Sequence, residues 1–252
     1  MKKLFIIILS LMFLTFSCRI QDTGTFKDTR DSSIYKVVQI GEQKWMSENL
    51  AFLPSVSDSM EGSVTEPYYY VYGYGGTNVN EAKATKNYTS YGALYNWEAA
   101  KIACPKGWHL PSDEEWKTLE LEIGMTKSEV DGGIRMLNNI EIHSSRRGNN
   151  EGGKLKSTGT TYWLNPNYGA TNESGFSALP AGRRSIHLLQ DVVTIGPSHD
   201  FYGLGMYSYF WSATESERNW IWLRILVFKN QLVNRIDLHK AYGFSVRCIK
   251  DE

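Results

Sequence analysis

Residues 93–116 read ALYNWEAAKIACPKGWHLPSDEEW, and this stretch carries the strongest structural signals in the chain. Apolar positions recur at spacings of four, three and four residues, which predicts one buried stripe of a helix: Ala93, Trp97, Ala100 and Cys104. Pro105 and Gly107 then end that helix. The stripe places Cys104 on the inward side of the predicted helix.

A second helix is predicted to begin at Ser112. The Ser112 hydroxyl and the Glu115 carboxylate have the spacing of a capping box, in which each side chain bonds the backbone of the other residue. Trp116, Leu119 and Ile123 then supply a buried face. Thr126 and Glu129 repeat the capping-box spacing and predict a third, short helix.

Strands are predicted on both sides of these helices. Residues 34–46 have the pattern of a β-hairpin, and the tyrosine run 68–74 fits a half-buried strand better than a binding platform. A β-meander is expected near the end of the chain, with strands at 220–228, 232–238 and 244–249. Helices followed by an antiparallel sheet indicate an α+β domain with two to three helices and long loops.

The N-terminus has the layout of an exported lipoprotein. Lys2 and Lys3 precede an apolar run from Leu4 to Phe16, and small Ser17 precedes Cys18. We predict a signal peptide at residues 1–17, lipid attachment at Cys18, a flexible tether at 18–30 and one domain at 31–252. An ordinary secretory signal with an incidental cysteine is the alternative.

Charge and cysteine content narrow the function classes. The chain has 27 basic and 27 acidic residues, so it lacks the basic excess of proteins that bind nucleic acid. With Cys18 used for lipid, Cys104 and Cys248 remain as an even pair in an oxidising compartment. We expect these two to form a disulfide, and two buried free thiols are the alternative.

Several motifs stand in a fixed order along the chain. They are Lys44–Leu50 (KWMSENL), Tyr91–Trp97 (YGALYNW), Cys104–Ser112 (CPKGWHLPS), Gly175–Pro180 (GFSALP), Phe210–Glu215 (FWSATE) and Gly243–Cys248 (GFSVRC). Together they closely resemble the Fibrobacter succinogenes major paralogous domain family over about residues 26–250. Members of that family are typically exported, often lipid-anchored bacterial proteins, and the resemblance brings no established reaction.

Two wider resemblances imply a fold. The helix that ends at Cys104 is similar to the first helix of C-type lectins, whose cysteine pairs with one in the last strand, and Cys248 would be that partner here. His109–Glu115 and Gly243-Phe244 are similar to formylglycine-generating enzymes, which use a related fold. The resemblance therefore implies a C-type-lectin-like fold.

Catalytic and metal-binding signatures are missing from the sequence. The formylglycine-generating enzymes need active-site cysteines, and both available cysteines match the structural pair instead. The calcium-binding motifs of C-type lectins are absent, and the histidines lack zinc-site spacing. The acids at 113–115 fit favourable charges at a helix start. We therefore expect no metal, no cofactor and no enzymatic activity.

The remaining hypothesis is a binding or adhesion module at the outer membrane, held by its lipid and recognising glycan or protein. Aromatic and charged residues of the loop-rich second half are the candidate ligand contacts: Trp163, Arg183, Arg184, Trp211, Glu215 and Trp220. Trp211 and Trp220 have an alternative place in the core of the sheet. An enzyme of formylglycine-generating ancestry and a purely structural envelope protein are the competing function classes.

Overall fold

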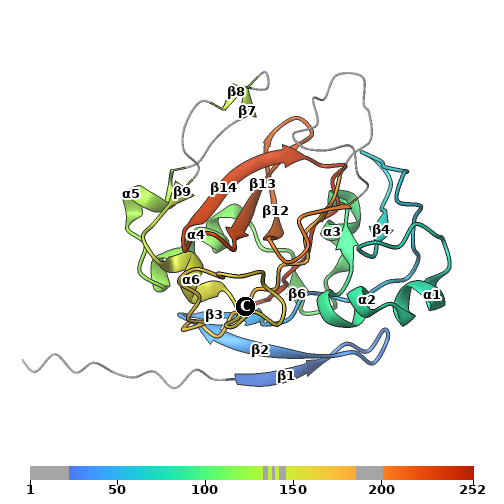
Figure 1. The fold of residues 1–252 in the computed structure, drawn as a ribbon, viewed down its shortest axis with the longest axis horizontal. Helices are drawn as coiled ribbons and strands as arrows, with labels where there is room; N and C mark the ends of the chain where they lie inside the picture. The colour runs from blue at the N-terminus through green and yellow to red at the C-terminus, as the bar shows by residue number, and fades with distance from the viewer. Residues whose placement is uncertain (1–22, 133–135, 138–139, 142–145, 186–200) are drawn as a thin grey trace, which may run out of the picture.

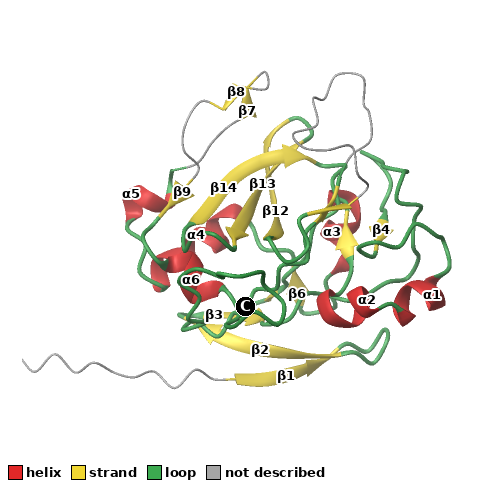
Figure 2. Cartoon of the chain, in the orientation of Figure 1, coloured by secondary structure: helices red, strands yellow, loops and turns green. Residues whose placement is uncertain are grey.

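The computed structural model describes residues 23–132, 136–137, 140–141, 146–185 and 201–252. The predicted signal peptide and Cys18 lie outside these residues. The described chain is a mixed α+β domain with antiparallel sheets and short helices (Figures 1 and 2). No helix among the described residues is both long and apolar enough to cross a membrane.

Two larger sheets form the framework. A five-stranded sheet has the order β1-β2-β3-β15-β6 and lies at the bottom of Figure 1. Its strands are β1 (Thr23–Lys27), β2 (Ile34–Ile40), β3 (Gln43–Met46), β15 (Ile249–Lys250) and β6 (Trp108–His109). The hairpin predicted at 34–46 is confirmed by the pairing of β2 with β3.

The second sheet has the order β12-β13-β14-β9. Its strands are β12 (Tyr207–Glu217), β13 (Trp220–Val227), β14 (Val233–His239) and β9 (Arg146–Arg147). The first two strands of the predicted meander are therefore confirmed. The predicted third strand is mostly wrong, because the backbone of residues 244–247 makes only isolated bridges, such as Tyr95 to Phe244, before β15 begins.

Short paired strands complete the sheets. They are β4 (Tyr69–Tyr70) with β5 (Leu94–Tyr95), β7 (Met136–Leu137) with β8 (Ile140–Glu141), and β10 (Arg183–Arg184) with β11 (Phe201–Tyr202). The strand predicted in the tyrosine run is thus confirmed only at two residues, which are both buried.

Six helices lie around the sheets in the described chain: α1 (Val79–Ala84), α2 (Lys86–Tyr91), α3 (Trp97–Ala103), α4 (Asp113–Glu122), α5 (Lys127–Val130) and α6 (Glu151–Leu155). Both predicted capping boxes are confirmed, at Ser112 and at Thr126. The first predicted helix begins later than expected, because the Asn96 side chain caps it and Ala93 precedes β5. The three helices that were not predicted are short and polar, so they show no apolar period.

Two large hydrophobic clusters and a small third one fill the described part of the domain. The first joins α3 to the face of β13 that carries Ile221, Leu223 and Ile225. The second contains Trp163 and four aromatic residues whose rings contact one another in part edge to face: Trp45, Trp116, Phe176 and Phe210. A heavy aromatic content is thus used mainly for packing.

The Cys104–Cys248 disulfide is present, with Cα atoms 5.9 Å apart. It ties the end of α3 to the segment before β15 and closes a sequence separation of 144 residues. In the chain-entropy account, a bond across a loop of this length stabilises the fold by about 4–5 kcal/mol.

The N-terminal boundary differs from the prediction. Residues 23–27 were expected to belong to the tether, but they form β1 and pair along their length with β2. Asp28 is fully buried and bonds Arg30, whose guanidinium also donates to the Ala103 carbonyl. The folded domain therefore includes Thr23–Arg30. The polar composition concealed this strand because its side chains are mostly exposed.

Candidate functional site

The candidate site is built on the loop after α6, residues 157–172, which we call the uncharged loop. None of its residues is Asp, Glu, Lys, Arg or His. It nevertheless exposes large apolar side chains: Tyr162 is 40% exposed, Leu164 50% and Tyr168 57%. Exposed rings on an ordered loop mark a surface that is suited to contact with a ligand.

Trp163 anchors this loop from the inside. It is 1% exposed, packs in the second hydrophobic cluster, and donates its Nε1–H to the Ala178 carbonyl at 3.0 Å. Its neighbours Tyr162 and Leu164 are both exposed. The prediction of Trp163 as a ligand contact is therefore wrong, since burial in the core leaves its ring no face for a ligand.

A buried lysine holds the two ends of the loop to neighbouring segments. The Lys156 ammonium donates to the carbonyls of Tyr168 (2.9 Å), Val227 (3.1 Å) and Asn230 (2.8 Å). The residue is fully buried, and burial lowers the pKa of its ammonium to about 8. One buried side chain thus donates to three backbone carbonyls.

Asn167 closes the loop on itself. Its Nδ2 donates to the carbonyls of Ser157 (3.0 Å) and Gly159 (2.8 Å). Nearby, Gly153 of α6 has no room for a Cβ, because the Gly169 carbonyl occupies that space. The backbone of the uncharged loop is thus fixed by side chains at its start, middle and end.

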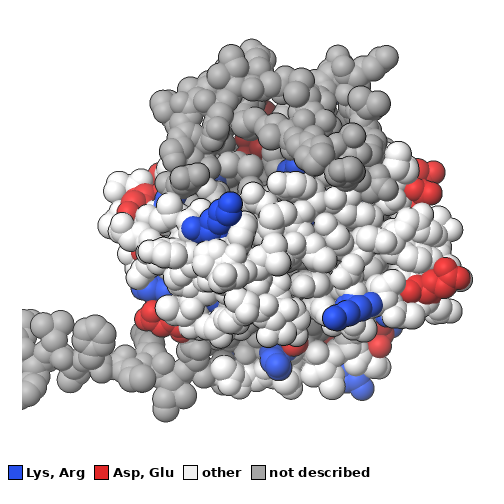
Figure 3. Space-filling model, in the orientation of Figure 1, with Lys and Arg blue, Asp and Glu red and all other residues white. Residues whose placement is uncertain are grey.

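The surface extends beyond the loop. The Tyr162 ring meets the Tyr91 ring of α2 edge to face at 5.8 Å, and the Leu164 amide donates to the Gly205 carbonyl at 2.8 Å. Residues 201–214 also lack charged residues. Figure 3 shows that the centre of the viewed face carries few charged side chains, where the yellow and orange loops between α6 and β12 run in Figure 1.

Two more of the predicted ligand residues are structural. Trp211 is fully buried, donates its Nε1–H to the Tyr95 carbonyl at 2.7 Å, and lies 4.4 Å from the Phe244 ring. Arg184 is 1% exposed and donates to the carbonyls of Ser59, Ala241 and Glu61. Neither can reach a ligand, because their polar groups already bond the backbone inside the domain.

The other three predicted residues lie apart from the uncharged loop in the sequence. Arg183 is 7% exposed, with its guanidinium 5.2 Å from the ring of Tyr202 and 5.2 Å from that of Tyr242. Glu215 is exposed on β12, and Trp220 is half-buried on β13, edge to face with His239 at 6.1 Å. The six residues therefore do not form one surface.

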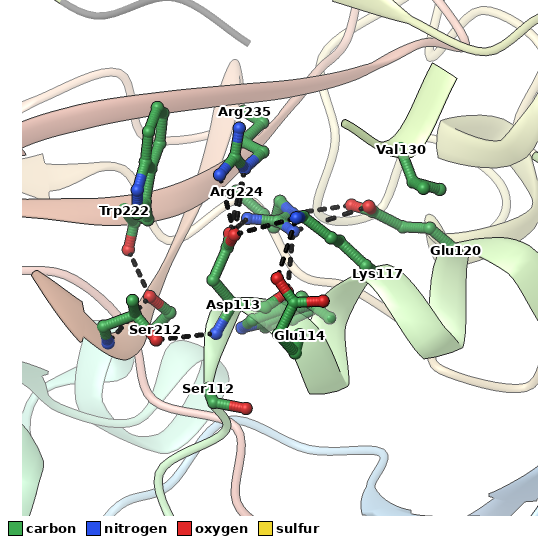
Figure 4. Close-up of polar contacts among 12 residues, drawn as sticks. Ser112, Asp113, Glu114, Lys117, Glu120, Val130, Ser212, Trp222, Arg224 and Arg235 are labelled. Atoms are coloured by element: carbon green, nitrogen blue, oxygen red, sulfur yellow. Dashed lines mark hydrogen bonds and ion pairs between the residues drawn. The ribbon is translucent and has the colours of Figure 1, made fainter. Parts of the chain in front are cut away.

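A buried ion cluster beside α4 is the densest polar feature of the described chain (Figure 4). Asp113 accepts hydrogen bonds from Arg224 (2.6 Å) and Arg235 (2.7 Å), and Glu120 accepts from Arg224 (2.6 Å) and Arg147 (2.7 Å). All five side chains are buried. Burial alone would raise the pKa of Asp113, but the two guanidinium groups outweigh it and hold this pKa well below its usual value.

This ion cluster fastens α4 to β13 and β14. Both carboxylates have their oxygens occupied by guanidinium groups, whereas acid–base catalysis needs a group within reach of a substrate. The prediction for Asp113 is therefore incomplete: it does stand at the start of a helix, but its main role is to neutralise two buried arginines.

His109 joins the C-terminal residues to α4. Its Nε2 lies 2.8 Å from Glu115 Oε1, and its Nδ1 lies 2.7 Å from Asp251 Oδ1. Partial burial would lower the pKa of His109, but the two carboxylates outweigh this effect and raise it. Among the described residues, no group of three or more His, Cys, Asp or Glu side chains is arranged to hold a metal ion.

Comparison with protein families matches residues 38–250 to the Fibrobacter succinogenes major domain. The chain belongs to this family. The match covers the β12-β13-β14-β9 sheet, the disulfide and the uncharged loop, so the candidate site is part of the family domain; β1 and most of β2 precede it. No curated protein and no solved structure matches the chain.

The sequence analysis missed Tyr162, Leu164 and Tyr168. A usable signal was present in the sequence, since residues 157–172 combine three large apolar or aromatic side chains around Trp163 with a complete absence of charge. The sequence did not show which of the aromatic rings in this loop is buried.

Proposed function

We propose that this chain is a non-catalytic binding or adhesion module of the bacterial cell envelope, which recognises glycan or protein through the uncharged loop. The observation that carries the proposal is the exposure of Tyr162, Leu164 and Tyr168 on a backbone held by Lys156, Trp163 and Asn167. A surface that is ordered before binding loses little conformational entropy when its ligand arrives.

Binding rather than catalysis is favoured by the state of the polar groups. Cys104 and Cys248, the cysteines of the mature domain, are used in a disulfide and supply no thiol for chemistry of the formylglycine-generating type. The charged side chains of the ion cluster beside α4 form ion pairs with one another.

We also propose a C-type-lectin-like fold and a lipid anchor at Cys18. The bond from the end of the Trp97–Ala103 helix to the segment before the last strand supports the first proposal. The apolar run that ends at Ser17-Cys18 supports the second. Metabolic labelling with a fatty-acid analogue should mark the wild type and not Cys18→Ala; label on the variant would contradict lipid attachment at this residue.

The binding function is tested with the purified full chain on a glycan panel and on immobilised envelope proteins, with calcium and with chelator. We expect binding to at least one class, equal in both conditions, and loss of binding in the Tyr162→Ala/Tyr168→Ala double variant. Binding that requires calcium would contradict the metal-free mode. Binding that the double variant retains would exclude the uncharged loop as the site.

A further inference from the structure

We infer that the uncharged loop binds an uncharged polysaccharide along the length of its chain, through Tyr162, Leu164 and Tyr168. This inference rests on the proposed function, and it names the class of ligand and the manner of contact. Three features of the surface carry it: its lack of charge, its position beside several segments and its ordered backbone.

The chemistry of the surface fits a neutral ligand. The exposed groups of the loop are two phenol rings, one leucine, threonine hydroxyls and an asparagine amide, and charged residues such as Glu173 and Lys229 only border it. An acidic polysaccharide or an anionic lipid surface would call for Lys or Arg at the contact. A neutral sugar presents C–H faces for the rings and hydroxyls for the polar groups.

The shape of the surface fits a chain rather than a chain end. Tyr162 lies against Tyr91 of α2, Leu164 lies next to Gly205, and the Tyr168 amide bonds the Phe228 carbonyl at 2.8 Å. The three exposed side chains thus stand beside three different segments. Two cavities of about 470 and 450 Å³ lie elsewhere, against β1 and against Glu115, and neither includes these side chains.

The rigidity of the surface fits rings that act as fixed stacking platforms. Tyr162 and Leu164 are held by the buried Trp163 between them, and the Tyr168 carbonyl is held by Lys156. Rings that are fixed before binding can stack on sugars without first being ordered.

The test is affinity electrophoresis of the full chain in gels that contain soluble polysaccharides, neutral (mixed-linkage glucan, galactomannan, xyloglucan) or acidic (alginate, polygalacturonate). We expect retardation by at least one neutral polymer, insensitive to salt, and none by the acidic ones. Tyr162→Ala and Tyr168→Ala should each weaken binding by about tenfold. Ile102→Ala removes an equally exposed apolar side chain from α3 and should change nothing.

Oligosaccharides of the polymer that binds separate a chain site from an end site. A hexasaccharide should bind at least about tenfold more tightly than a disaccharide, because a longer ligand can contact more of the three side chains at once. Equal affinity for both lengths, or retardation by acidic polymers alone, would overturn the inference.

Other occupants of the surface are outcomes of the same experiment. The tyrosine variants could abolish binding to neutral or anionic vesicles, and the surface would then be a membrane contact. They could instead dissociate a dimer in solution, and the surface would then be a contact between two copies of the chain. Either result would contradict a polysaccharide as the ligand. If the tyrosine variants lose a protein ligand while no polysaccharide binds, the proposed function stands and this inference falls. If they lose no binding of any kind, both fall. Unchanged melting temperatures confirm that the variants are folded.

Discussion

The Lys156 ammonium lies 5.4 Å from the centre of the Trp163 ring, and both residues are buried beneath the uncharged loop. No carboxylate neutralises this ammonium in the described contacts; three backbone carbonyls and an aromatic face surround it instead. The loop therefore depends on one cation for the hydrogen bonds of three segments.

Lys156→Met keeps an unbranched side chain that is one heavy atom shorter, and removes its hydrogen-bond donors. We expect the free energy of unfolding to fall by about 3 kcal/mol, because buried carbonyls lose their partners. Urea unfolding followed by tryptophan fluorescence measures this. Lys106→Met, at an exposed lysine, is the control and should change stability by less than about 0.5 kcal/mol. A loss as small as that of the control would show that the carbonyls are not held by Lys156.

Asp113→Asn tests the ion cluster. Removing the charge leaves Arg224 and Arg235 buried without their shared carboxylate, which should cost about 3–5 kcal/mol. The exposed Asp131→Asn is the matched control and should cost far less, because its ion pair with Lys117 is screened by solvent. Calorimetry at neutral pH compares the two, and equal losses would contradict the importance of the cluster.

Acid unfolding follows from the depressed pKa of the same carboxyl. In the unfolded chain the Asp113 carboxylate takes up a proton near pH 3.8. In the folded chain the same carboxylate stays ionised to a lower pH. Asp113 therefore stabilises the fold above pH 3.8, and this contribution is lost as pH falls toward the folded-state pKa. The stability of Asp113→Asn should depend less steeply on pH between about 4 and 2. A parallel dependence in both proteins would contradict this assignment.

The position of His109 predicts a titration that a single substitution should move. Its carboxylate partners raise the pKa of the imidazole above 6.5, so the stabilising charge is fully present below that pH and is lost as pH rises through the folded-state pKa. Asp251→Asn should lower the pKa that NMR measures for His109. Asp58→Asn, in another loop, should leave it unchanged. An unaltered His109 titration in Asp251→Asn would mean that the contact is not maintained in solution.

Trp211 and Trp220 should respond differently to truncation. Trp211 is fully buried, so Trp211→Ala should cost about 3–5 kcal/mol, while half-buried Trp220 should cost clearly less. Thermal melts of the two variants measure the difference. Equal and large losses would show that Trp220 is also a core residue.

Local signals in the sequence predicted the parts of the fold that depend on neighbouring residues. The capping box at Ser112, the first hairpin and β13 each follow from residues that lie close together in the chain. Strand β1 was not predicted, because it is stabilised by pairing with β2. Its polar, mostly exposed side chains show no pattern from which this pairing could be predicted.

The candidate site was harder to predict, because ring orientation is decided by tertiary packing. Trp163 and Tyr162 are adjacent aromatic residues in one polar loop, yet one is buried and the other exposed. The difference depends on the Ala178 carbonyl and on the second hydrophobic cluster, which are formed by distant segments. Aromatic content alone therefore did not distinguish the buried ring of Trp163 from the exposed ring of Tyr162.

The early start of β1 would limit how far the domain could move from a lipid on Cys18. Cys18 precedes Thr23 by five residues, a length of chain that spans at most about 18 Å when fully extended. With a lipid on Cys18, the outer edge of the five-stranded sheet would remain within that distance of the bilayer. Such a short connecting segment would restrict the domain to ligands that lie close to the membrane that holds the lipid. It would prevent the domain from contacting a neighbouring cell.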